Sequence, residues 1–219
     1  MKRFVPRYLD PASRLGEILF GLIMVLTITL TAGFVIDEGR KGVRELLLAA
    51  LGCNIAWGFI DAVMYLMSCV TVRSEKAKLI TAVQSAPDTA TALTLVQDGV
   101  EPELQSMLNP ADADGFNRTI MQHLYRARPI RSTLSRDDFY GALACFILVF
   151  FSCLPAALPF FILSNPGIAL RISNFLLIAL LFVVGRMWAR YVGVSPLLSG
   201  SIMVLVGLAL VGVAILLGG

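Results

Sequence analysis

Five long apolar runs dominate the sequence and limit what it can fold into. They cover residues 15–36, 45–70, 139–163, 168–190 and 195–217. A helix needs about 20 mostly apolar residues to cross the roughly 30 Å hydrocarbon core of a bilayer, and each run is long enough. The runs do not alternate apolar and polar residues as the strands of a membrane β-barrel do, and a helix satisfies its own backbone hydrogen bonds in lipid. The sequence therefore predicts an all-α, multi-pass integral membrane protein with five transmembrane helices.

The composition supports this fold class and excludes several others. Hydrophobic residues make up 57% of the 219 residues and charged residues 15%, whereas soluble proteins average about 45–50% apolar and about 25% charged residues. The 18 basic and 15 acidic residues lie mostly outside the apolar runs, and no Asp or Glu follows Asp138. A soluble enzyme, a disordered chain and a nucleic-acid-binding protein all fit poorly, and we expect no nucleic-acid partner.

A long polar stretch, residues 71–138, divides the chain into three parts. Residues 1–70 hold an N-terminal segment and the first two membrane helices, and residues 139–219 hold the last three. Between them, Pro and Gly separate short pieces whose apolar residues recur at helical spacing. We expect a small helical insert with short helices over residues 71–86, 88–97, 101–108 and 115–128.

The distribution of Lys and Arg predicts the orientation in the membrane, because the cytoplasmic ends of membrane helices are enriched in these residues. The N-terminal segment, both ends of the insert and the turn between the fourth and fifth helices carry most of them. The opposite side has only Arg40, Lys41, Arg44 and Arg171. We therefore place the N-terminus and residues 71–138 in the cytoplasm and the C-terminus on the opposite side. Residues 1–14 lack the features of a signal peptide and are interpreted as a cytoplasmic segment.

Proline and glycine predict how the last three helices bend and end. Pro155 and Pro159 lie inside the third run and should bend it, because proline removes a helical hydrogen bond. Ser195 followed by Pro196 is a typical helix start, and Gly193 should supply the turn before it.

The sequence offers no catalytic constellation. Cys53, Cys69, Cys145 and Cys153 lie in the apolar runs without the C-x-x-C spacing of zinc or redox motifs, and we interpret them as buried apolar side chains. His123 is the only histidine, and one histidine cannot assemble a three-histidine metal centre. The sequence contains no phosphate-binding loop, dinucleotide fingerprint or nucleophile elbow. We expect neither enzymatic activity nor a resident cofactor.

Asp61 is the residue that most needs an explanation, because a charge at the centre of a membrane helix costs about 2.5–3.5 kcal/mol on insertion scales. Asn54 and Ser68 lie seven residues before and after Asp61, which is two helical turns in each direction. Gly58, Met64 and Tyr65 are expected on the same face. The first helix has a matching stripe made of Glu17, Gly21, Met24 and Thr31. A short loop makes these two helices antiparallel neighbours. We therefore expect the stripes to face each other or a shared cavity.

The two stripes contain ligands suited to a divalent transition metal. Carboxylate and amide oxygens bind divalent cations, and thioether sulfur favours the softer transition metals. A carboxyl group in a low dielectric can also exchange a proton for a cation. We expect Asp61 to be the principal ligand and proton carrier and Glu17 to be the ligand on the cytoplasmic side. The auxiliary ligands would be Met64, Met24 and Asn54.

The sequence leaves a structural alternative open for the same residues. Asp61 could instead be protonated, or paired with Asn54 or Arg186, and only hold helices together. Arg186 lies within the fourth run. We favour the interpretation that the Arg186 side chain extends to the cytoplasmic interface. The alternative is that Arg186 is the counter-charge to Asp61.

Several short motifs are shared with a known family. The third run contains Gly141, Leu154-Pro155 and Leu158-Pro159. Gly193-Val194-Ser195-Pro196 leads into the fifth run, which continues with Ser199, Met203 and Gly207. In the first half, Leu15-Gly16 and Gly21-Leu22 match an "LG…DGL" pattern, and Ile60-Asp61-Ala62 falls where "GEF" stands. With the order of two spans, a helical insert and three spans, the chain resembles the vacuolar iron transporter (VIT) family of iron and manganese transporters. It differs at Phe20, where the family has an Asp, and its insert has few of the family's Glu and Met ligands.

The resemblance implies a homodimer whose first helices line a path at the two-fold axis. It also implies antiport of a cation against protons, out of the cytoplasm. The expected partners are thus Fe²⁺ or Mn²⁺ as transported substrate, protons, the lipid bilayer and a second copy of the chain. The alternative is a non-transporting membrane scaffold or regulatory protein of the same fold that has lost the metal sites, which Phe20 and the insert favour.

Overall fold

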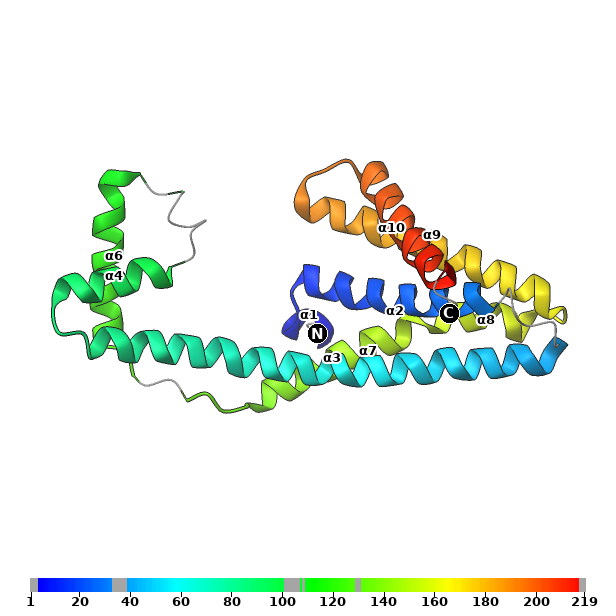
Figure 1. Cartoon of the computed structure of the whole chain (residues 1–219), viewed down its shortest axis with the longest axis horizontal. Coiled ribbons are helices and arrows are strands. Elements are labelled where there is room, and N and C mark those ends of the chain that lie inside the picture. The colour runs from blue at the N-terminus through cyan, green and yellow to red at the C-terminus, as the bar shows by residue number, and fades with distance from the viewer. Residues whose placement is uncertain (1–3, 33–38, 101–106, 108, 129–130, 217–219) are drawn as a thin grey trace. The chain divides into compact units, whose positions relative to one another are not determined.

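The computed structural model describes residues 4–32, 39–100, 107, 109–128 and 131–216. Within these ranges every regular element is a helix, and five helical stretches are long and apolar enough to cross a membrane. The expected all-α fold with five membrane-spanning helices is thereby confirmed. The elements are α1 (Phe4–Tyr8), α2 (Pro11–Ala32), α3 (Gly39–Gln84), α4 (Thr89–Gly99), α6 (Pro110–Tyr125), α7 (Arg136–Ser152), α8 (Leu154–Ile162), α9 (Pro166–Val192) and α10 (Pro196–Leu216) (Figure 1).

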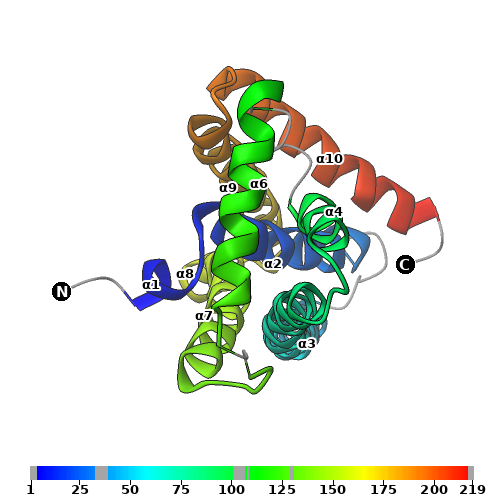
Figure 2. The same ribbon diagram turned by 90° about the vertical axis from the view of Figure 1, so that its left-hand side faces the viewer.

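The chain divides into two compact units, one made of residues 1–65 and 136–219 and the other of residues 66–135. In the first unit, which we call the membrane unit, α2 packs against α7, α9 and α10 (Figure 2). The core of this unit is formed by leucine and valine side chains of α2 and α9: Leu15, Leu22, Val25, Leu26, Leu177, Leu181 and Val184. Buried residues of α3, α8 and α10 complete it. These are the positions that a helical period directs inward.

The second membrane helix is longer than the sequence predicted. A boundary was expected after residue 70, with a separate helix over 71–86, but α3 runs without interruption from Gly39 to Gln84. The prediction was wrong because it followed the change in polarity. No Gly or Pro lies between Gly58 and Pro87, so the backbone has no reason to break where the side chains become polar.

Two other boundaries in the insert also differ from expectation. α6 begins at Pro110 rather than at residue 115, because Pro suits the first turn of a helix, where its missing N–H is not needed. The expected helix over residues 101–108 lies almost entirely outside the described residues.

The third apolar run is bent, as its prolines predicted. α7 ends at Ser152 and α8 begins at Leu154, with Pro155 in the first turn of α8. A neighbouring helix supplies a donor near this break, since the Ser173 hydroxyl of α9 donates to the Ala156 carbonyl of α8 at 2.7 Å. A backbone carbonyl beside the bend thus accepts a hydrogen bond inside the protein.

α9 and α10 form an antiparallel pair that depends on small residues. Gly193 adopts φ +77° at the turn between them, which confirms the expected role of this glycine. The Ser199 hydroxyl donates to the Gly185 carbonyl at 2.7 Å. A Cβ atom at Gly185 would lie 2.6 Å from the Ser199 carbonyl oxygen and 2.8 Å from Gly200 Cα. The two backbones can approach this closely only because Gly185 has no side chain.

In the second unit, α4 and α6 pack on the end of α3 around Val83, Ala92, Val96 and Met121. Gln84 Nε2 donates to carbonyl oxygens at the end of α6, including Leu124 at 3.0 Å and Ala127 at 2.9 Å. A single amide side chain of α3 therefore binds the backbone at the end of α6 and just beyond it.

We predict that Gly185→Ala destabilises the membrane unit by about 1–3 kcal/mol, the typical cost of forcing a methyl group into a packed core. Gly212→Ala is the matched control on α10, because nothing lies within 4 Å of a Cβ atom there. Unfolding of the purified variants in detergent, followed by circular dichroism, measures the difference. Equal stability of the two variants would contradict the close approach of α9 and α10.

We also predict a pH-dependent cap on α4. Hydrogen bonds from the backbone N–H and hydroxyl of Thr91 lower the pKa of Asp88 below its ordinary 3.8. The charged cap therefore stabilises α4 above that ordinary pKa, and this contribution is lost as the pH falls through the lowered pKa. Asp88→Ala should shift the amide NMR signals of residues 89–92 toward coil values at neutral pH, and Asp88→Asn should not, since Asn caps without a charge. Identical spectra for both variants would show that the cap is dispensable.

Candidate functional site

Three helices of the membrane unit approach closely around the predicted polar stripes, and a glycine lies at each approach. A Cβ atom at Gly21 of α2 would lie 1.9 Å from Ser152 Oγ of α7. One at Gly58 of α3 would lie 3.1 Å from the Phe146 ring, also on α7. These contacts bring α2, α3 and α7 together around one interior line.

Glu17 and Asp61 meet on this line. Glu17 comes from α2 and Asp61 from α3, and their carboxyl groups lie within hydrogen-bonding reach of each other. A hydrogen bond between two carboxyl groups requires a proton on one of them, because two carboxylates only accept. Asp61 Oδ2 is buried and receives no hydrogen bond from any donor among the described residues. The pair can thus share a proton when one member is protonated, and it presents a vacant acceptor oxygen.

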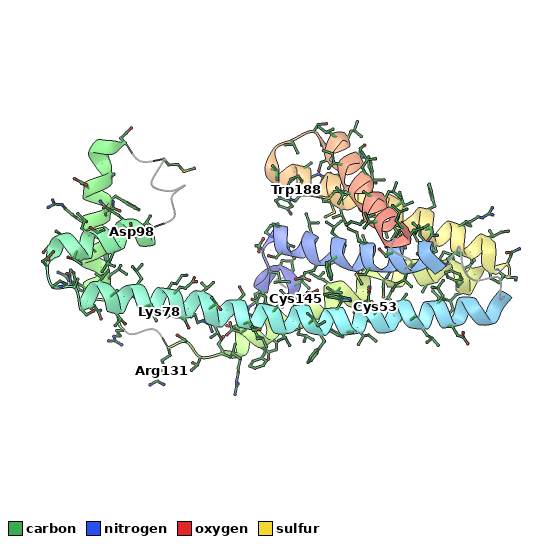
Figure 3. All side chains as sticks on the ribbon, in the orientation of Figure 1. Cys53, Lys78, Asp98, Arg131, Cys145 and Trp188 are labelled. Carbon is green, nitrogen blue, oxygen red and sulfur yellow. The ribbon has the colours of Figure 1, made fainter. Side chains whose placement is uncertain are left out.

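Cys145 on α7, labelled in Figure 3, lies beside Glu17 of this pair, a contact that the sequence analysis did not predict. The residue is only 1% exposed. A signal was present in the spacing, since Cys145 follows Gly141 by four residues and therefore lies on the same face of α7. The tight fit of Gly141 beneath the Tyr65 ring marks that face as the one toward α3.

Asn54 lies on the same face of α3 as Asp61, and it is fully buried. Its Nδ2 donates to the Gly21 carbonyl at 3.4 Å and the Val149 carbonyl at 3.3 Å. Its Oδ1 is buried without a hydrogen-bond partner among the described residues. Asn54 therefore ties α3 to both neighbouring helices and presents one unused oxygen beyond the carboxyl pair.

The structure does not gather the two methionines with the carboxyl groups. Met64 is 60% exposed on the surface of α3, although it is only three residues from Asp61. Met24 is half-buried on α2, two turns from Glu17. Ser68 is exposed, and the side chain of Thr31, the last residue of the expected stripe, lies outside the described residues.

Two further residues singled out in the sequence lie away from the carboxyl pair. Arg186 is exposed, and the hydrogen-bond partner of Asp61 is Glu17, so the structure gives no support to Arg186 as its counter-charge. Phe20 packs edge-to-face on Trp57 with ring centroids 5.2 Å apart. An aromatic contact between α2 and α3 thus occupies the position at which an acid was expected from the resemblance.

The arrangement can hold a proton, but within one protomer it does not form a complete metal site. In the described part of the chain, no three His, Cys, Asp or Glu side chains are grouped closely enough to hold an ion. The two carboxyl groups are hard donors suited to a divalent cation, and the amide oxygen of Asn54 lies two turns further along α3. Water, backbone or a second copy of the chain would have to supply the remaining ligands.

Comparisons with known proteins identify the family of this chain. A comparison with curated protein sequences finds no match. A sequence profile described as the VIT family matches residues 67–219, which is more than half of the chain. The matched part contains α7 to α10, and Glu17, Asn54 and Asp61 lie before it. The chain belongs to the VIT family, a membership that points to a metal-ion transporter.

Proposed function

We propose that the protein moves a divalent transition metal, Fe²⁺ or Mn²⁺, out of the cytoplasm in exchange for protons. The observation that carries the proposal is the close approach of the Glu17 and Asp61 carboxyl groups inside the membrane unit. A buried carboxyl group on a membrane helix is costly, and two that share a proton form a group able to accept a cation when that proton leaves.

The exchange is favourable because it limits the charge left in the low-dielectric interior. With its proton the pair carries one negative charge, and without it two. A divalent cation neutralises two carboxylates, so metal entry and proton loss compensate each other. Release of the metal would leave the doubly charged pair, which regains a proton and resets the site.

Each residue receives a role in this proposal. Asp61 is the principal ligand and proton carrier, because its Oδ2 is the vacant buried acceptor, and Glu17 is the ligand nearer the cytoplasm. Asn54 offers its unused Oδ1 as an auxiliary contact. Met24 and Met64 would contribute thioether sulfur, and Met64, being 60% exposed, can do so only at an interface with another copy of the chain.

The incomplete donor set supports a homodimer, since a second protomer could supply the missing ligands. The distribution of Lys and Arg supports a cytoplasmic N-terminus and a cytoplasmic position for residues 71–138. Metal would then enter from the side of Glu17, near the start of α2, and leave toward the end of α2.

A non-transporting scaffold of the same family is the second candidate function. It is favoured by Phe20, whose ring packs on Trp57 where the resemblance leads one to expect an acid. A scaffold keeps the helical packing and has no need of the proton shared by Glu17 and Asp61. Metal flux and metal binding therefore separate the two candidates.

We predict that Asp61→Asn and Glu17→Gln each reduce Mn²⁺-driven proton movement at least about tenfold, since each removes one acidic group from the pair. Proteoliposomes with a pH-sensitive dye measure the proton flux. Glu45→Gln is the matched control, because Glu45 is an exposed acid on the same helix as Asp61 and should leave the flux unchanged. Wild-type flux in the Asp61→Asn variant would remove this residue from the mechanism.

We also predict that metal binding by the purified protein strengthens with rising pH. Binding displaces the shared proton, so the apparent Kd for Mn²⁺ should fall by about tenfold per pH unit while the pair is protonated. Isothermal titration calorimetry in buffers of different ionisation enthalpy measures both the Kd and the released proton. Asp61→Asn should abolish the pH dependence. A wild-type protein that binds no Mn²⁺ above the empty-micelle background would favour the scaffold.

A further inference from the structure

A second feature of the membrane unit lies at the end where α2 begins and α9 ends. A cavity of about 350 Å³ opens there between α1, α2, α7 and α9. Its lining is mostly apolar and includes Leu15 and Ile18 of α2 and Leu148 of α7. Since α2 begins and α9 ends beside it, the mouth of this cavity is expected where hydrocarbon meets the headgroups of a bilayer.

Among the described residues that line the cavity, one carries a charge, and that charge is positive. Arg14 stands at its edge, half-buried in the first turns of α2. Arg14 Nε donates to the Asp10 carbonyl at 3.3 Å. This bond fixes the guanidinium group and leaves its two terminal nitrogens to face other acceptors. Planar guanidinium groups bind phosphate oxygens well because they can donate two parallel hydrogen bonds.

The surroundings of Arg14 strengthen the positive character of this rim. Arg7 directly follows the lining residue Pro6, and Arg190 directly precedes the lining residue Tyr191. Both arginines are exposed. Asp10, which precedes α2, accepts hydrogen bonds from Ser13 and Ala12 and is thereby committed to capping α2.

Aromatic side chains mark the same level of the membrane. Phe4, Tyr8 and Tyr140 form a cluster with ring centroids 5.2 to 6.1 Å apart, and Tyr191 lines the cavity. Aromatic residues of this kind concentrate at the interface between hydrocarbon and water.

The opposite end of the membrane unit provides a contrast. A larger cavity of about 610 Å³ lies there, lined by Leu48, Leu51, Phe160 and Phe161 among others. Its described lining contains no ionisable side chain. An apolar cavity alone would accept any hydrocarbon, whereas the cavity at Arg14 combines hydrocarbon-lined space with a fixed cation.

We propose that the cavity beside Arg14 binds an anionic phospholipid, with the phosphate on the Arg14 guanidinium group and one acyl chain against Ile18 and Leu148. The charge of the rim selects the headgroup, and the apolar interior accepts the chain. This assignment does not depend on metal transport, because it rests on another set of residues and holds equally for a scaffold.

The test compares lipid retention by the full-length protein and its variants. Protein purified from nanodiscs containing equal amounts of phosphatidylglycerol and phosphatidylcholine is examined by native mass spectrometry. We expect phosphatidylglycerol to dominate the lipid that stays bound to the wild type. Arg14→Gln should reduce this preference by about fivefold, the effect of one arginine near an anionic lipid. The matched control is Arg171→Gln, an exposed arginine at the other end of α9, which should retain the preference.

A second variant keeps the proposal falsifiable if Arg14→Gln fails to fold. Leu148→Trp fills the apolar part of the cavity and should lower retention of both lipids while the circular dichroism spectrum stays helical. Equal retention of the two lipids by the wild type would overturn the proposal. So would an equal effect of Arg14→Gln and Arg171→Gln, or unchanged lipid retention in Leu148→Trp.

Discussion

The meeting of two acids in the membrane unit depends on how closely three helices can approach. Glu17 belongs to α2 and Asp61 to α3, and both helices reach α7 through glycine, Gly21 against Ser152 and Gly58 against Phe146. Small residues let membrane helices pack by dispersion forces and short polar contacts, where no hydrophobic effect drives association within lipid. A side chain at either glycine would separate the helices, and the carboxyl groups would then lie apart, each without a partner.

The fold could be predicted from the sequence to the extent that each signal was local. Apolar length gave the five spans, Pro155 gave the bend between α7 and α8, and Gly193 gave the turn before α10. The continuity of α3 was not predicted, because a change from apolar to polar side chains does not by itself end a helix. Side chains from residue 71 onward are polar, yet they are good helix formers, so the helix continues to Gln84.

The site could be predicted only in part, because periodicity places a residue on a face without saying what that face meets. Glu17, Asn54 and Asp61 were identified from their spacing, and the structure brings the two acids together. Met64 shares nearly the same angular position as Asp61, but the packed arc of α3 is narrow, and Met64 falls outside it. Cys145 was interpreted as a buried apolar side chain, since only the crossing of α7 with α2 shows that its thiol reaches Glu17.

The carboxyl pair and the cavity at Arg14 share two helices, α2 and α7. Ile18, which lines the cavity, follows Glu17 directly on α2, and Leu148 lies three residues from Cys145 on α7. Packed helices transmit a displacement because their interiors have little free volume. An acyl chain in the cavity would therefore hold α2 and α7 at the spacing that keeps Glu17 beside Cys145. An empty cavity would let the two helices move together and change the position of Glu17 relative to Asp61. Lipid composition would thus act on the proton-holding pair without touching it, through the distance between two helices.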